Sequence, residues 1–416
     1  MKNFIHPSLS IIFFLWKISL SQVSVTAIDA APKFGRTRAL SMGGVTIATS
    51  QGIEALSGNP GGLALLDGIQ IAISGSARLY GKSDFYESYY TYLECYSSKI
   101  NKSFGLTDLG IVFPISIPKP SIKLVGAMGY RRFYDWNHKK EEEWYDDYDE
   151  GNIKSKRIYE IEGALHLLSL GLGTVISERC SFGMSINFPL RKGYKTETLE
   201  ESQHPHETYT YRYTENWNIS AKYFVQWGGI FRVFSKLSVG VFCLMNHKFI
   251  LHDRRSSVSY KVTGTTHYNY EGDDKNEWEI PTTFDFGIAY RLKPHLLLAA
   301  EAQSRPWANW RINDLPIYGV ENGNAYRLGI EYGKRIQYRA GFAVDRLPLL
   351  DANDDPVNIK SVSAGIGFPM NPLIVDMGAS YQFTTFDADK RGSIAEYHIR
   401  ELKLSMSLTY NSTSNR

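Results

Sequence analysis

Alternation of apolar and polar residues along most of the chain is the feature that most limits its fold. Near the C-terminus, one apolar face comprises Leu402, Leu404, Met406, Leu408 and Tyr410. A second apolar face is assigned to Trp217, Ile219, Ala221, Tyr223, Val225 and Trp227. Successive side chains of a β-strand point to opposite faces, so a period of two predicts strands with one apolar face. The fold is therefore expected to be all-β.

About fourteen segments carry this pattern, an even number, as in bacterial single-chain membrane barrels. They are 69–80, 105–115, 121–136, 155–176, 180–194, 211–233, 236–252, 279–292, 294–312, 324–333, 335–346, 358–369, 372–386 and 397–410. Leu165, Leu167 and Leu168 interrupt the alternation in one of them, which predicts a β-bulge there.

The connections between these segments alternate between short and long. The short ones are Ile117–Pro120, Ser177–Arg179, Ser235–Lys236, Lys293–Pro294, Gly333–Lys334 and Met370–Asn371. The long ones lie near 81–104, 137–154, 195–210, 253–277, 313–323, 347–357 and 387–396. Short turns at one end and long loops at the other are typical of an outer-membrane barrel. A soluble sandwich stays as an alternative, and it requires the apolar faces to be buried against each other.

Composition agrees with a membrane barrel and excludes other classes. The 27 Tyr and 8 Trp suit membrane–water interfaces. No stretch after residue 30 approaches the roughly 20 apolar residues of a spanning helix. The net charge of +3, from 46 basic and 43 acidic residues, gives no nucleic-acid footprint. Cys95, Cys180 and Cys243 form neither a disulfide framework nor a zinc pattern.

The N-terminus carries the pattern of a secretory signal. Lys2 precedes a largely apolar run from Leu9 to Leu20, and Val25-Thr26-Ala27 offers small residues for cleavage. Residues 1–27 are therefore expected to be a signal peptide, and the mature chain is expected to be exported.

Residues 34–66 contain the most specific motif. A glycine pair marks close backbone approach or positive φ, and Asn-Pro-Gly-Gly is a strong turn signal, so a turn-rich linker would also explain the segment. In combination, however, the segment resembles the N-terminal hatch of the FadL/TodX family, outer-membrane transporters of long-chain fatty acids and other hydrophobic compounds. The residues that carry the motif are Arg38, Met42, Gly43, Gly44, Asn59, Pro60, Gly61 and Gly62.

This resemblance implies a transmembrane antiparallel β-barrel at 67–410 with residues 28–66 plugging its lumen, followed by a polar tail at 411–416. It implies the outer membrane of a Gram-negative cell envelope, where a monomer would take up hydrophobic small molecules by diffusion. The expected partners are a fatty-acid-like ligand and outer-membrane lipid, with no nucleic acid and no cofactor.

A fatty-acid carboxylate inside the barrel would need Arg or Lys. By strand parity, the candidates that face the lumen are Arg78, Lys123, Arg131, Arg327 and Arg339. Each could instead pair with a lumen acid, namely Asp285, Glu301, Glu331 or Asp345. Phe34 and Arg36 of the hatch could also contact ligand. Aromatic residues of the first long loop could collect ligand or pack on one another; they are Tyr80, Phe85, Tyr86, Tyr89, Tyr90, Tyr92 and Tyr96.

No catalytic signature is present, so no enzymatic activity is expected. The chain has no Gly-x-Ser-x-Gly elbow, phosphate-binding glycine loop or His-Glu-x-x-His. The motif His204-Pro205-His206-Glu207 could ligate a metal, but loop imidazoles are more often solvated. The run Asp351–Asp355 begins like a calcium loop, but Pro356 stands where such a loop needs Gly. No metal site is therefore predicted.

An alternative function comes from barrels related to FadL, such as PorV-type proteins. These proteins resemble FadL in the hatch motif, but they serve as secretion or assembly platforms that bind protein partners. A continuous apolar pocket beneath the hatch would favour transport, and a lumen packed with polar side chains would favour the platform.

Overall fold

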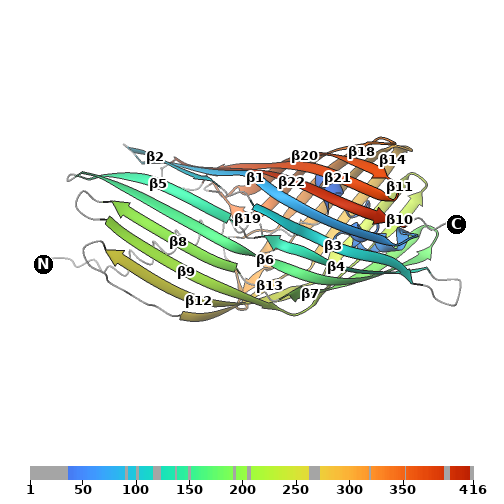
Figure 1. Cartoon of the computed structure of the whole chain (residues 1–416), viewed down its shortest axis with the longest axis horizontal. Helices are drawn as coiled ribbons and strands as arrows, with labels where there is room; N and C mark the ends of the chain where they lie inside the picture. Colours follow the sequence, from blue (N-terminus) through green and yellow to red (C-terminus); the bar gives the residue numbers. More distant parts are fainter. Residues whose placement is uncertain are drawn as a thin grey trace.

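Fourteen antiparallel strands close into a barrel in the computed structural model (Figure 1). The first and last strands pair, with Gln70 opposite Asn411, and this pairing closes the sheet. The barrel strands are β1 (Gln70–Tyr89), β3 (Ser103–Ile115), β4 (Leu124–Asp135), β6 (Gly151–Ser177), β7 (Cys180–Leu190), β10 (Phe224–Phe234), β11 (Leu237–Leu244), β14 (Thr283–Lys293), β15 (Leu296–Arg305), β18 (Gly323–Tyr332), β19 (Gln337–Leu350), β20 (Pro356–Met370), β21 (Leu373–Asp387) and β22 (Ile394–Asn411).

At the long-loop end, further strands extend the wall beyond the barrel, toward the left of Figure 1. They are β2 (Tyr92–Lys99), β5 (His138–Tyr148), β8 (Tyr194–Gln203), β9 (Thr208–Ala221), β12 (His247–Lys261), β13 (Gly272–Ile280), β16 (Arg311–Ile312) and β17 (Leu315–Pro316). Strand β6, with 27 residues, belongs to both parts, because it pairs with β4 and β7 in the barrel and with β5 and β8 in the extension.

The structure describes residues 36–89, 92–99, 103–115, 123–135, 138–148, 151–190, 194–203, 208–261, 272–317, 320–351, 353–387 and 394–412. Its helices are α2 (Thr37–Ser41), α3 (Ile53–Ser57), η1 (Pro60–Leu65) and η2 (Trp307–Asn309). None of the helices in this part of the chain is long and apolar enough to cross a membrane.

The outer surface of the barrel carries the apolar faces that the alternation predicts. On β22, Leu404, Leu408 and Tyr410 are exposed, whereas Ser405 and Thr409 between them are buried. The same holds on β7, where Phe182 and Met184 face outward. The sheet closes on itself, and within the described residues no second sheet packs against these faces, so the sandwich interpretation is wrong.

One predicted strand is two strands. The segment 211–233 is interrupted at Lys222 and Tyr223, between β9 and β10. Ile219 is only 6% exposed and faces the interior, whereas Tyr223 is 63% exposed. The assignment of both to one apolar face is therefore wrong, because the break shifts the parity of all following side chains.

The bulge predicted at Leu165, Leu167 and Leu168 lies instead on the partner strand β4, where Phe133 is the extra residue opposite Leu165 and His166, and a second irregularity in β6 lies at Ile176. The pairing of β4 with β6 shifts register between Arg132 and Tyr134, and that of β6 with β7 shifts between Val175 and Ser177. Short turns at 178–179, 235–236, 294–295 and 371–372 join neighbouring strands at one end, called here the short-turn end. The predicted turn Ile117–Pro120 lies outside the described residues.

Residues 36–66, called here the N-terminal segment, lie inside the barrel. Ala39, Met42, Val45 and Leu63 are fully buried. Helix α2 contacts β19 to β22, α3 contacts β1, β3, β4 and β6, and η1 contacts β4, β6, β7 and β10. The segment thus contacts the interior wall on several sides at once.

Gly341 of β19 is a position at which the packing of the N-terminal segment against the wall can be tested. A Cβ at this position would meet the backbone of Met42 and Gly43. We expect Gly341→Ala to lower the free energy of unfolding by about 1–3 kcal/mol, because neither backbone can retreat. Urea unfolding of the purified barrel in detergent measures this change. The matched control is Gly75→Ala, whose Cβ would have Gly105 O as its nearest contact, at 3.3 Å. An equal loss of unfolding free energy in both variants would contradict the close packing of the N-terminal segment against β19.

Candidate functional site

The glycine pair of the motif lets the N-terminal segment touch the barrel wall. Gly43 and Gly44 have φ of 73° and 85°, in the left-handed region that favours glycine. A Cβ on Gly43 would lie 2.8 Å from the carbonyl oxygens of Leu328 and Phe342. The backbone N–H of Gly43 donates to Ser363 Oγ at 2.8 Å. The positive φ and the short distances from a Cβ to these carbonyl oxygens therefore both require glycine at this position.

Asn59 fixes the second half of the motif. Its Nδ2 donates to the carbonyl oxygens of Ile47 at 2.6 Å, Gly229 at 3.0 Å and Val241 at 3.1 Å. Its Oδ1 accepts from the N–H of Gly61 at 3.0 Å, so it also caps η1. One buried amide thus joins two parts of the segment to strands β10 and β11.

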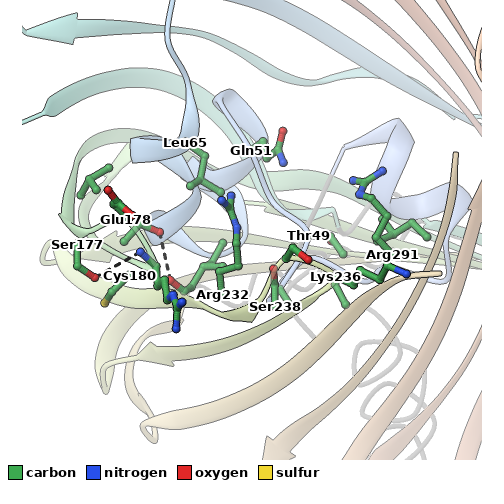
Figure 2. A pocket seen from close by; sticks show the side chains of 18 of the residues that line it. Thr49, Gln51, Leu65, Ser177, Glu178, Cys180, Arg232, Lys236, Ser238 and Arg291 are labelled. Atoms are coloured by element: carbon green, nitrogen blue, oxygen red, sulfur yellow. Dashed lines mark hydrogen bonds between the residues drawn. The ribbon is translucent and has the colours of Figure 1, made fainter. Parts of the chain in front are cut away.

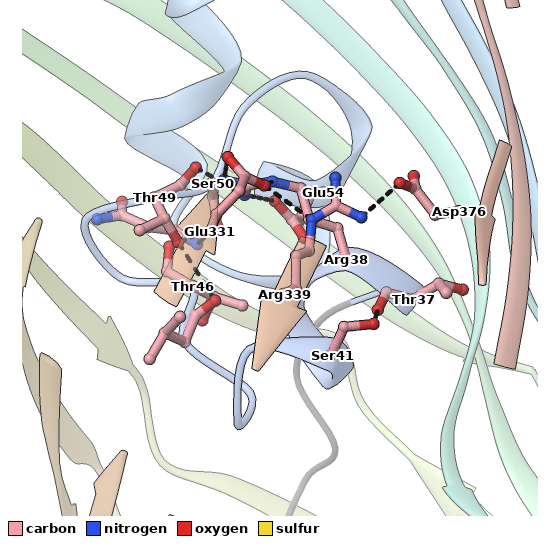
Figure 3. A network of polar contacts seen from close by, with 12 residues as sticks. Thr37, Arg38, Ser41, Thr46, Thr49, Ser50, Glu54, Glu331, Arg339 and Asp376 are labelled. Carbon is pink, nitrogen blue, oxygen red and sulfur yellow. Dashed lines mark hydrogen bonds and ion pairs between the residues drawn. The ribbon is translucent and has the colours of Figure 1, made fainter. Parts of the chain in front are cut away.

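Buried ion pairs join the segment to the opposite wall (Figure 3). Arg38 contacts Glu54 at 3.1 Å and Glu331 at 2.9 Å. Arg339 contacts the same Glu331 at 2.8 Å and Asp376 at 2.6 Å. We call Arg38, Glu54, Glu331, Arg339 and Asp376 the ion-pair network. Because each charge has an opposite partner, the network can stay ionised away from water.

Glu54 is the acid of this network that belongs to the N-terminal segment and not to a spanning strand. Burial raises the pKa of its carboxyl above the usual range, and the Arg38 guanidinium opposes that shift. Its ionised form therefore depends on the contact with Arg38.

A second group of charges holds the other side of the glycine pair. Arg327 contacts Asp345 at 3.0 Å and donates to Gly44 O at 3.3 Å, and Arg305 contacts Asp345 at 3.2 Å. The carboxylate of Glu301 accepts from the backbone N–H groups of Thr46 and Ile47. These charges hold the backbone of the segment in place.

The remaining predicted cations are also placed. Arg36 contacts Asp108 at 2.6 Å, and Arg78 contacts Glu401 at 3.3 Å. Lys123 pairs with Asp67, which is 87% exposed, so its expected pairing with a lumen acid is wrong. Lys123 lies just before the first residue of β4, so it is not on a lumen-facing strand position. Phe34 and the aromatic residues of the first loop lie outside the residues whose side chains are described.

Arg131 differs from the other lumen arginines. It donates to Asn187 Oδ1 at 3.0 Å, to Gln226 Oε1 at 3.2 Å and to Ser57 O at 3.3 Å, all neutral acceptors. No carboxylate of the described residues forms an ion pair with it, and its Nε has no hydrogen-bond partner there. Arg131 therefore carries a buried positive charge without a direct ion pair. The acid opposite it on β3 is Asp108, whose direct ion pair is with Arg36.

An apolar cluster fills the interior beside Arg131, in the half of the molecule nearer the long loops. The guanidinium lies 5.1 Å from the ring centroid of Phe133, which packs 5.5 Å from the ring of Phe224. We call this group the aromatic cluster: Ile47, Phe133, Tyr134, Leu165, Leu167, Ile219, Phe224, Phe242, Leu244, Phe249, Leu251, Ile280, Trp307 and Trp310. The lumen around the N-terminal segment combines ion pairs with two smaller apolar clusters, whereas the larger aromatic cluster lies beyond it.

Two polar atoms border this cluster without protein partners among the described residues. They are Nε2 of His247, whose ring stacks on Phe224 at 4.5 Å, and Nε1 of Trp310. The alternation of residues along the strands did not predict this cluster, because it assigned only polar side chains to the lumen. The available signal was the apolar pair Leu165 and Leu167, which fell out of phase with the other strands.

In the part of the chain that the structure describes, no three His, Cys, Asp or Glu residues group as a metal site would need. Asp351 instead accepts from the backbone N–H groups of Asn353 and Asp355, each at 2.8 Å. The motif His204–Glu207 lies outside the described residues.

Together, the closed antiparallel sheet, the apolar outer surface and the interior sites define a transmembrane β-barrel protein similar to FadL-type barrels. The chain belongs to the BamG family, whose family model, described as BamG, matches residues 20–413. No curated protein sequence matches it.

Several solved barrels share the fold at low sequence identity. The toluene transporter TodX of Pseudomonas putida has 12% identity and a TM-score of 0.61, with 91% of this chain and 99% of that chain covered. A FadL homologue of Pseudomonas aeruginosa has 14% identity and a TM-score of 0.58, with 91% and 98% covered. The toluene transporter TbuX of Ralstonia pickettii has 10% identity and a TM-score of 0.54, with 92% and 99% covered. The resemblance to FadL and TodX is confirmed for the fold.

The ion-pair network makes a prediction for stability. We expect Arg339→Gln to lower the free energy of unfolding by about 3 kcal/mol, because Asp376 then stays buried without its cation. Urea unfolding in detergent provides the measurement.

The matched control is Arg346→Gln, which removes a 2.8 Å pair with the largely exposed Glu321. That loss should stay below about 1 kcal/mol. If both variants unfold at the same urea concentration, the network does not stabilise the barrel.

Proposed function

We propose that this protein is an outer-membrane transport protein for hydrophobic small molecules that carry an acidic end, such as long-chain fatty acids. The observation that carries the proposal is the aromatic cluster with the unpaired Arg131 at its edge. The short-turn end would face the periplasm and the long loops the outside, as in other barrels of this kind.

The two parts of this site suit the two parts of an amphiphile. Buried aromatic and aliphatic side chains can replace water around an acyl chain. A carboxylate would form a charge-assisted bond with Arg131, and such bonds are strong where water is excluded. Because the present partners of Arg131 are amides and a carbonyl, an incoming carboxylate displaces no ion pair.

Beyond the aromatic cluster, the N-terminal segment blocks the proposed route through the lumen. Ion pairs, hydrogen bonds and apolar contacts hold the segment against the wall, so in the proposal passage requires the segment to move. In the proposal it acts as a plug or hatch, fastened by the ion-pair network and Asn59. Opening would then demand the exchange of buried ion pairs, which makes the closed state the resting one.

The similar structures described as toluene transporters and a FadL homologue support this choice. The polar contacts of the lumen are the feature expected of a PorV-like platform. We prefer transport because a platform would leave the aromatic cluster, and Arg131 without a direct ion pair beside it, without a role.

Native mass spectrometry of the detergent-extracted protein tests the proposal. We expect a bound fatty acid in the unmodified protein and about a tenfold loss of fatty-acid affinity in Arg131→Gln, since one charged hydrogen bond contributes about 1.5–3 kcal/mol. Arg131→Lys should retain part of the affinity, because it keeps the charge.

Arg311→Gln, which removes an exposed charge from β16, serves as the control and should bind like the unmodified protein. Thermal unfolding of each variant checks that the barrel is intact. An intact protein that binds no amphiphile, or an Arg131→Gln variant with full affinity, would overturn the proposal.

A further inference from the structure

A separate pocket opens at the short-turn end, away from the aromatic cluster (Figure 2). It has a volume of about 220 Å³ and lies between the N-terminal segment and the turns that join β6 to β7, β10 to β11 and β14 to β15. We call it the mouth pocket. No step of the proposed transport uses it.

The rim of the mouth pocket is cationic. Arg179, Arg232, Lys236 and Arg291 contribute four basic side chains, against the single carboxylate of Glu178. The backbone brings them together in pairs, since Arg232 N donates to Arg179 O and Arg291 N donates to Lys236 O, both at 2.7 Å. Arg38 also lines the pocket, but it is paired with Glu54 and Glu331, so the four cations of the rim exceed the acid of the rim by three charges.

These four cations are exposed and not neutralised. Arg291 donates to the carbonyl of Pro294 at 3.2 Å, but none of the four forms an ion pair with a carboxylate within the described ranges. The lumen arginines Arg38, Arg327 and Arg339, by contrast, each contact at least one acid. Cations gathered around a concavity without acids are the arrangement that recognises anionic groups.

Part of the pocket lining is apolar. Buried Ala48 of the N-terminal segment lies there with Ile230 of β10 and Leu297 of β15. The volume is below the roughly 300–1,000 Å³ of sites that enclose a small-molecule ligand. It accommodates a side chain or a chain end, while the rim extends beyond it over three turns.

We propose that the mouth pocket binds an acidic peptide segment of a protein partner at the short-turn end of the barrel. An apolar side chain of that segment would enter the pocket, and its carboxylates would contact the cations of the rim. The separation of those cations over three hairpins favours several carboxylates on one extended chain over a single head group. The inference does not depend on transport.

Fluorescence anisotropy with the full-length protein in detergent tests the proposal. The probe is a labelled short peptide of alternating glutamate and leucine, and its lysine–leucine counterpart is the negative control. We expect the double variant Arg232→Gln/Arg291→Gln to weaken binding of the acidic peptide about tenfold, and added salt to weaken it further.

The matched control is Lys334→Gln/Arg335→Gln, which removes two exposed cations at the same end of the barrel but outside the pocket. It should change the affinity less than about twofold. Equal losses in both double variants would show unspecific attraction and overturn the proposal. Displacement of the peptide by equimolar decanoate would also overturn it, because the site would then recognise a small amphiphile.

A second measurement needs no variant. Cys180 lines the mouth pocket and is partly exposed, so a bound peptide should slow its alkylation by a thiol reagent, as followed by mass spectrometry of the digested protein. Unchanged alkylation of Cys180 at saturating peptide would place the peptide elsewhere and contradict the proposal.

Discussion

Neutralisation of buried charge is the constraint on which the interior of this barrel depends. The strands place arginines and acids on the inner face, and each would be costly there without a partner. Glu331 shows the solution, because it accepts from Arg339 of the neighbouring strand and from Arg38 of the N-terminal segment. The segment therefore completes the charge balance of the wall as well as occupying the lumen. Among the described residues, Arg131 and the buried Asp285 form no direct ion pair, and the aromatic cluster lies beside Arg131.

The interior consequently differs along the barrel. Around the N-terminal segment, amides, carboxylates and guanidinium groups pair with one another, and small apolar clusters such as Met42 with Leu297 pack between them. Nearer the long loops, rings such as Phe133 and Phe224 pack against each other. The proposed ligand would lie at the boundary between these two regions.

Much of this architecture could be predicted from the sequence, since one face of each spanning strand meets lipid. Parity alone placed Arg327 and Arg339 inside, and it anticipated their pairing with Asp345 and Glu331. Parity failed where the chain leaves the bilayer, because Lys222 and Tyr223 interrupt the strand and move Ile219 inward. The aromatic cluster could not be found in this way, since its members come from strands distant in sequence. The mouth pocket went unpredicted for the same reason, since it lies between turns whose proximity only the closed barrel defines.

The enclosure of the N-terminal segment has a consequence for how the chain reaches its final form. The segment precedes every strand, yet its contacts run from β1 to β22, and the pairing of these two strands closes the wall. The segment therefore contacts both strands of the seam, through α3 on β1 and α2 on β22. Contacts between such distant parts of a chain form slowly, so we expect the seam and the contacts of the segment with it to form late in folding.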